Sequence, residues 1–196
     1  MKREKIGIRS LSVLGLMAAL VFSSNYIQFM IPTPLGTTRI HIANGICLLG
    51  ALLFGGVKGG MAAGIGSFFY DLTFPEYVAT SWVTFIMKFL MALICGLLVY
   101  AGNNRSGDAP VHILRRVIGS IAGALSYVAM YVAKQFIEQC LLLGVSYEAV
   151  ALNVLTTKLP ASLLNAALAV PIAVMLHSVL RPALQKAKLS EGFGVK

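Results

Sequence analysis

The chain has 196 residues, of which 58% are hydrophobic and 12% are charged, and its mean hydropathy is +0.82. A soluble domain carries about twice that share of charged residues, so the composition excludes an ordinary soluble enzyme or binding domain. The net charge of +9 is not evidence for a nucleic-acid partner, because the basic residues flank apolar segments. The sequence therefore predicts an all-α integral membrane protein.

Helix-breaking residues divide the apolar sequence into six predicted transmembrane helices of one domain, residues 1–196. The first helix ends before Pro32 and Pro34, because two prolines so close together cannot continue a helix. A glycine-rich turn and a proline turn bound the third helix, and the polar stretch 102–116 precedes the fifth. The predicted helices are 10–30, 42–54, 57–73, 81–101, 117–143 and 153–180, of which the second is short for a full span.

The distribution of basic residues predicts the orientation of these helices. If both termini and the loop 102–116 are cytoplasmic, twelve of the 16 Lys and Arg residues lie on the cytoplasmic side. Only Arg39 lies outside, and the remaining three are lysines within apolar segments. Cytoplasmic loops carry an excess of Lys and Arg, so we expect both termini to be cytoplasmic.

The three lysines inside apolar segments are Lys88, Lys134 and Lys158. In the predicted topology each lies six to nine residues from the outer end of its helix, so all three belong to the outer leaflet. A charge in hydrocarbon costs about 3 kcal/mol or more, so three lysines at one level predict a shared aqueous pocket.

Other polar side chains follow the lysines at helical spacing. Tyr131 and Glu138 lie three residues before and four after Lys134, and Ser162 and Asn165 follow Lys158 in the same way. Two further candidates come from the first outside loop and the start of the second helix. The predicted ligand-binding residues are Arg39, Asn44, Lys88, Tyr131, Lys134, Glu138, Lys158, Ser162 and Asn165.

A purely structural explanation of the same residues stays open. Lys134 with Glu138 and Lys158 with Asp71 are possible ion pairs, and Lys88 has the length to extend its ammonium toward the outer surface. If the pocket has an excess of cations, it suits a ligand with a carboxylate, a phosphate or electron-rich ring carbonyls.

Two further patterns concern partners and catalysis. Gly15, Ala19 and Ser23 are spaced four apart on the first helix, and small residues at that period let another helix approach closely, in this chain or in a partner. The sequence contains no HExxH and no GxxxxGK[ST] motif, so we predict no catalytic residue, no metal and no cofactor. Any use of ATP must then belong to a partner.

Four segments in chain order resemble the S components of energy-coupling factor (ECF) transporters. The similarity covers the first loop and second helix, the third helix, the lysine motif of the fourth helix and the sixth helix, at residues 38–55, 59–72, 84–91 and 158–165. The resemblance implies a non-enzymatic, multi-pass protein of a prokaryotic plasma membrane with the bundle of an S component. In this family an Ala-xxx-Ala pattern on helix 1 contacts the transmembrane T component, and here Gly15, Ala19 and Ser23 occupy the pattern with two departures from alanine.

The resemblance also implies a substrate and partners. The chain is expected to capture a vitamin or precursor from outside, of the riboflavin, hydroxymethylpyrimidine or pyridoxine class, with pantothenate and folate as further possibilities. A T component and two ABC-type ATPases then drive uptake. Two alternatives remain: a membrane enzyme acting on a lipid or isoprenoid phosphate, and a solitary secondary transporter with Glu138 or Asp71 as its proton carrier.

Overall fold

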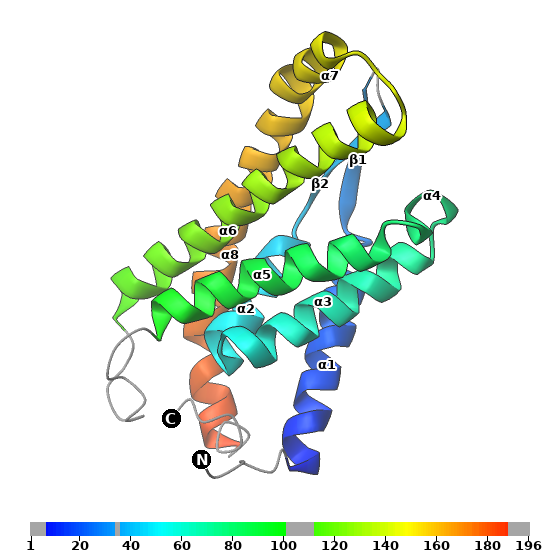
Figure 1. Ribbon diagram of the computed structural model, residues 1–196. Helices are drawn as coiled ribbons and strands as arrows, with labels where there is room; N and C mark the ends of the chain where they lie inside the picture. Colours follow the sequence, from blue (N-terminus) through cyan, green and yellow to red (C-terminus); the bar gives the residue numbers. More distant parts are fainter. Residues whose placement is uncertain (1–6, 34–35, 101–111, 188–196) are drawn as a thin grey trace, which may run out of the picture.

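The computed structural model describes residues 7–33, 36–100 and 112–187 as a bundle of helices with one β-hairpin (Figure 1). In chain order the elements are α1 (Ile8–Ser24), β1 (Gln28–Thr33), β2 (Gly36–His41), α2 (Ala43–Phe54), α3 (Gly56–Leu72), α4 (Pro75–Val78), α5 (Ser81–Val99), α6 (Ile113–Phe136), the π-helix η1 (Ile137–Leu142), α7 (Tyr147–Asn153), the π-helix η2 (Val154–Lys158) and α8 (Leu159–Lys186).

Each of the six predicted helices has a counterpart in this structure. Three helices are long and apolar enough to cross a membrane among the residues described, namely Ser81–Val99, Ile113–Leu142 and Tyr147–Lys186. Helix α1 and helix α2 are apolar but shorter. In Figure 1 the start of α1 and the end of α8 lie at the bottom, and the hairpin, α4 and α7 lie toward the other end of the bundle.

The predicted end of the first helix, residue 30, is wrong. Helix α1 ends at Ser24, and β1 pairs with β2 in an antiparallel hairpin in which Gln28 lies opposite His41 and Met30 opposite Arg39. The segment after α1 contains β-branched and aromatic residues such as Ile27, which favour an extended backbone. Two nearby prolines prevent a helix from continuing through this segment. Pairing of the two strands instead provides hydrogen-bond partners for its backbone groups.

The last two predicted helices differ in their ends. Helix α6 begins at Ile113, inside the predicted loop 102–116, whose residues up to 111 lie outside the described part of the chain. The final helical segment runs from Tyr147 through η2 to Lys186 and includes Pro171 and Pro182. It is therefore longer than the predicted range 153–180, because neither proline ends it.

Helix α2 forms the centre of the bundle, packed against α3, α5 and α8. All of its residues except Leu53 are buried, which explains why a helix of about 18 Å can be apolar without spanning the membrane by itself. Close contact with α3 depends on Gly59, because a Cβ atom there would lie 2.3 Å from the backbone oxygen of Gly50.

Candidate functional site

A polar cavity of about 280 Å³ lies at the end of the bundle that carries the hairpin and α4. Its walls come from β2, from the ends of α3 and α5, from α6 with η1, and from η2 with α8. Asn44 lies beside the cavity, where its side-chain oxygen accepts a hydrogen bond from the lining residue Lys88. Eight of the nine predicted ligand-binding residues line the cavity, namely Arg39, Lys88, Tyr131, Lys134, Glu138, Lys158, Ser162 and Asn165.

Lys88 supplies one of the most deeply buried charges of the cavity. The residue is only 2% exposed, so its ammonium does not extend to the outer surface. Its Nζ donates a hydrogen bond to Oδ1 of the buried Asn44 and lies 4.5 Å from the ring centroid of Tyr127. An ammonium carries three N–H donors, and these neutral partners do not cancel its charge. The arrangement therefore favours an electron-rich acceptor in the cavity.

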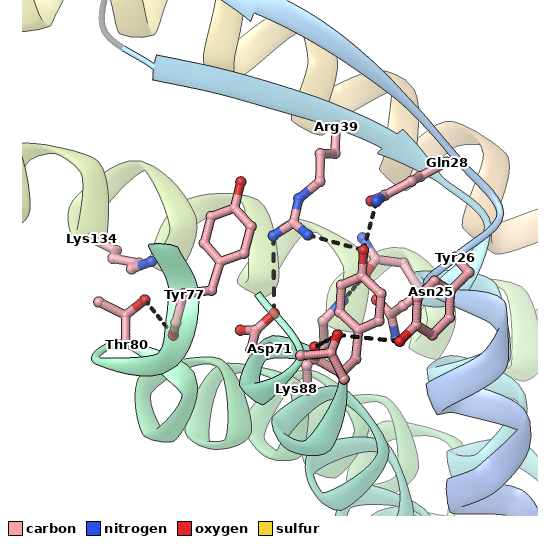
Figure 2. Close-up of polar contacts among 12 residues, drawn as sticks. Asn25, Tyr26, Gln28, Arg39, Asp71, Tyr77, Thr80, Lys88 and Lys134 are labelled. Carbon is pink, nitrogen blue, oxygen red and sulfur yellow. Dashed lines mark hydrogen bonds and ion pairs between the residues drawn. The ribbon is translucent and has the colours of Figure 1, made fainter. Parts of the chain in front are cut away.

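Arg39 connects the hairpin to the opposite wall of the cavity. Figure 2 shows its guanidinium extending from β2 toward Asp71, whose Oδ1 lies 4.0 Å from Nη2. The same guanidinium lies 4.2 Å from the ring centroid of Tyr77 and donates to the hydroxyl of Tyr70 at 3.4 Å. Asp71 is therefore paired with Arg39 rather than with Lys158.

His41 is a cavity residue outside the predicted set of ligand-binding residues. It ends β2 and lines the cavity, and its Nδ1 is buried with no hydrogen-bond partner among the described residues. Burial, together with the positive charges of Lys88 and Arg39, holds the pKa of His41 well below its usual value. The ring is therefore neutral at physiological pH and offers a hydrogen-bonding group to the cavity.

Protein partners also occupy the polar atoms of three other predicted residues, namely Lys134, Glu138 and Asn165. Lys134 Nζ lies 3.4 Å from Glu138 Oε2, so the ion pair that the sequence left open is present. Asn165 Oδ1 accepts from the backbone N–H of His41 at 2.8 Å, and its Nδ2 donates to the backbone oxygen of Arg39 at 2.7 Å. The Asn165 amide therefore holds β2 against α8.

Replacing Asn165 with leucine is expected to loosen the hairpin rather than remove a ligand contact. Two partly buried hydrogen bonds disappear, each worth about 1 kcal/mol, so we expect up to about 30-fold weaker ligand binding. The measurement is backbone hydrogen exchange in β2 together with the ligand Kd. Exchange at His41 should accelerate, and Ser162→Ala is the control, since the Ser162 hydroxyl bonds the backbone oxygen of Lys158 within its own helical segment. Unchanged exchange would contradict the positioning role.

Further lining residues were not among the predicted ligand contacts. Tyr127 lies one helical turn before Tyr131, and their rings are stacked with centroids 6.3 Å apart. Gln135 and Gln139 are buried on the adjacent face of α6 and η1. Their spacing of four residues, about one helical turn, was the pattern in the sequence that could have indicated them. Among the described residues, no group of three or more His, Cys, Asp or Glu side chains is arranged to hold a metal ion.

The small residues of α1 lie away from the cavity. Gly15, Ala19 and Ser23 are exposed, and a Cβ atom at Gly15 would have no neighbour within 4 Å. This face is therefore not used for close packing among the described residues.

Comparison with known proteins identifies the family of this chain. The sequence profile of the ECF-type riboflavin transporter, S component, matches residues 5–182. The chain belongs to this family. It is thus the substrate-binding S component of an ECF transporter, a non-enzymatic, multi-pass membrane subunit of bacterial type. A search of curated proteins finds no match to the chain.

The fold of this S component is similar to that of a solved relative. The structure of the S component of a bacterial ECF transporter superposes with a TM-score of 0.60 and 17% sequence identity. The match covers 90% of this chain and 97% of the other. At this identity the similarity concerns the fold.

Proposed function

We propose that this S component captures riboflavin or a chemically similar vitamin in the cavity beneath the hairpin. The observation that carries the proposal is the buried ammonium of Lys88, which is held by Asn44 and Tyr127 and has no carboxylate within ion-pair distance in the described part of the chain. A ring carbonyl or a carboxylate of the ligand supplies the missing acceptor. The name of the family supports riboflavin among the vitamin classes that the sequence left open.

The aromatic side chains of the cavity support a ligand with a flat ring. The stacked pair Tyr127 and Tyr131 forms one wall, and Tyr77 lies on the α4 side. Ligand pockets commonly combine such aromatic surfaces with a few polar groups that fix orientation. Hydroxymethylpyrimidine and pyridoxine also have a flat ring. Pantothenate has no ring, so its binding relies on the cations of the cavity alone.

The ligand is proposed to enter from outside, between the hairpin and α4. Arg39 spans this entrance through its contacts with Asp71 and Tyr77, so the entrance opens when these contacts separate. The excess of basic residues at the opposite end supports the orientation with cytoplasmic termini.

A T component and two ABC-type ATPases are the proposed partners that convert capture into uptake. The exposed face of Gly15, Ala19 and Ser23 is the proposed contact with the T component, because small side chains allow close approach of helices.

Replacing Ala19 with leucine is expected to abolish ATP-driven uptake without changing ligand affinity. The added side chain separates the two helices but lies far from the cavity. Uptake of labelled vitamin into proteoliposomes containing all subunits, together with the Kd of the isolated chain, measures the two effects. Leu20→Phe, an enlargement at the neighbouring exposed position, is the matched control. Normal uptake by Ala19→Leu would contradict the assigned contact.

The same proteoliposomes test the two alternative functions. The S component alone should bind the vitamin but transport none, and uptake should require the T component, both ATPases and ATP. Uptake by the chain alone along a proton gradient would identify a secondary transporter. Conversion of a lipid phosphate by the purified chain would identify an enzyme.

A further inference from the structure

A second group of basic side chains lies where α2, α6 and α8 meet, at the end of the bundle away from the hairpin (Figure 1). Arg116 Nη1 lies 2.8 Å from Nδ1 of His177 and 3.2 Å from Oγ of Ser178. His177 is only 2% exposed and also bonds the backbone oxygen of Leu52. Because a guanidinium can only donate, His177 Nδ1 accepts and the ring is neutral.

His177 and Tyr100 together satisfy the end of α2. The Tyr100 hydroxyl donates to the backbone oxygen of Leu52 at 2.5 Å, and this oxygen is also the acceptor for His177. The last carbonyl groups of a helix have no hydrogen-bond donor within the helix, so these two side chains supply the missing donors. This structural role accounts for His177, Tyr100 and one N–H of Arg116.

For Arg181, no hydrogen bond or ion pair is found among the described residues. Arg181 follows His177 by one helical turn on α8 and interacts electrostatically with Arg116, His177 and Tyr100. The Nε atom of Arg116 is buried and has no hydrogen-bond partner in the described part of the chain. His177 thus connects the two arginines, since it bonds Arg116 and lies one helical turn before Arg181, and Arg116 keeps an unused donor at Nε.

No carboxylate compensates this pair within the ranges that the structure describes. The acidic residues there are Asp71, Glu76, Glu138 and Glu148, on α3, α4, η1 and α7. The first three line the cavity at the hairpin end, and Glu148 belongs to the short helix at the same end. Two cations close together repel each other, so an anion that binds beside them stabilises this arrangement.

The space beside Arg181 is lined mainly by apolar side chains. A small crevice runs between the end of α2 and the last turns of α8, with walls formed by Leu52, Leu53, Phe54 and Leu184. His177, Arg181 and Gln185 form its polar part. The crevice therefore joins the Arg181 guanidinium, with Arg116 behind His177, to a hydrocarbon surface, which suits a ligand that is anionic at one end and apolar beyond it.

We propose that Arg181 and Arg116 bind the phosphate of an anionic phospholipid in the cytoplasmic leaflet, with an acyl chain along Leu53 and Leu184. Basic pockets between transmembrane helices on the cytoplasmic side hold such head groups, and guanidinium groups bind phosphate through paired hydrogen bonds. The apolar crevice favours a lipid over an acidic segment of a protein partner. The assignment to the cytoplasmic leaflet rests on the proposed orientation, whereas the site itself is independent of the vitamin.

Native mass spectrometry of the full chain tests the proposal. The protein is released from nanodiscs that contain equal amounts of phosphatidylglycerol and phosphatidylcholine, and the retained lipids are counted. We expect one phosphatidylglycerol per chain for the wild type. Arg181→Gln should lower this occupancy about fivefold, the effect expected of one basic residue at an anionic surface, and Arg181→Lys should restore part of it. Lys186→Gln, which removes the same charge outside the crevice, is the control.

Three results would overturn the lipid assignment. Equal losses in Arg181→Gln and Lys186→Gln would show that the chain binds anionic lipid only through general surface charge. Displacement of phosphatidylglycerol by inorganic phosphate as effective as by a soluble short-chain phosphatidylglycerol would show a site for free phosphate. Unchanged lipid occupancy in Arg181→Gln with weakened assembly of the T component and ATPases would show a protein contact instead.

Discussion

Replacing Lys88 with methionine is expected to abolish vitamin binding while the protein remains folded. Methionine has nearly the same length and removes the charge that the proposed function assigns to the ligand. Losing a buried, charge-assisted interaction costs about 3 kcal/mol, which corresponds to about a 100-fold increase in Kd. The measurement is a titration of the purified variant with riboflavin, followed by fluorescence, beside its thermal unfolding.

The stability of this variant separates a ligand role from a structural one. The variant loses the hydrogen bond to Asn44 but no longer buries an ammonium, so its free energy of unfolding should change by about 1 kcal/mol or less. Lys134→Met is the matched control, because the Lys134 ammonium is partly exposed and already paired with Glu138. Its affinity should change only a few-fold. A folded Lys88→Met that binds like the wild type would contradict the proposed role of Lys88.

Adding one methyl group at Gly59 is expected to prevent stable folding. In Gly59→Ala the new Cβ would lie 2.3 Å from the oxygen of Gly50 and 2.5 Å from the nitrogen of Ala51, and both are backbone atoms. Relief requires that α2 and α3 move apart, and such overpacking costs about 3 kcal/mol or more. Thermal unfolding of the isolated chain in detergent measures the loss.

Gly15→Ala is the matched control for this substitution. It is the same chemical change in another apolar helix, but nothing lies within 4 Å of the added Cβ. Alanine is the better helix former by roughly 0.5–1 kcal/mol, so the isolated variant should be as stable as the wild type or slightly more so. Equal melting temperatures for the two variants would show that α2 and α3 do not pack as closely as described.

The sequence was sufficient to predict some of the residues that line the cavity because they repeat at the period of a helix. Lys134 and Glu138 share one face of a helix wherever it packs, and so do Lys158 and Ser162. The depth of Lys88 in its apolar segment follows in the same way from counting residues. These are local properties, and the structure places all five residues around one cavity.

Contacts between distant segments could not be predicted in this way. The amide of Asn165 binds the backbone of β2 more than 120 residues away in the sequence, so its positioning role depends on a hairpin that the sequence analysis assigned partly to helix and partly to a loop. Arg39 pairs with Asp71 for the same reason. The burial of His41 likewise follows from where the hairpin lies and has no periodic signal.

The sequence analysis also did not predict the two π-helices. Segment η1 contains Glu138 and Gln139, and η2 ends at Lys158, so both contribute to the cavity wall. A π-turn inserts an extra residue into the helical repeat and re-aims the side chains that follow. Sequence spacing that assumes 3.6 residues per turn predicts which residues lie near one another here, but not where each side chain points.

Native mass spectrometry of the gently purified chain, expressed in a vitamin-replete host, tests the central claim most directly. We predict one co-purified vitamin per wild-type chain and none in Lys88→Met. The mass of the ligand identifies it as riboflavin or as a member of another class. An empty wild-type protein whose melting temperature does not shift with any vitamin in a panel would contradict the account.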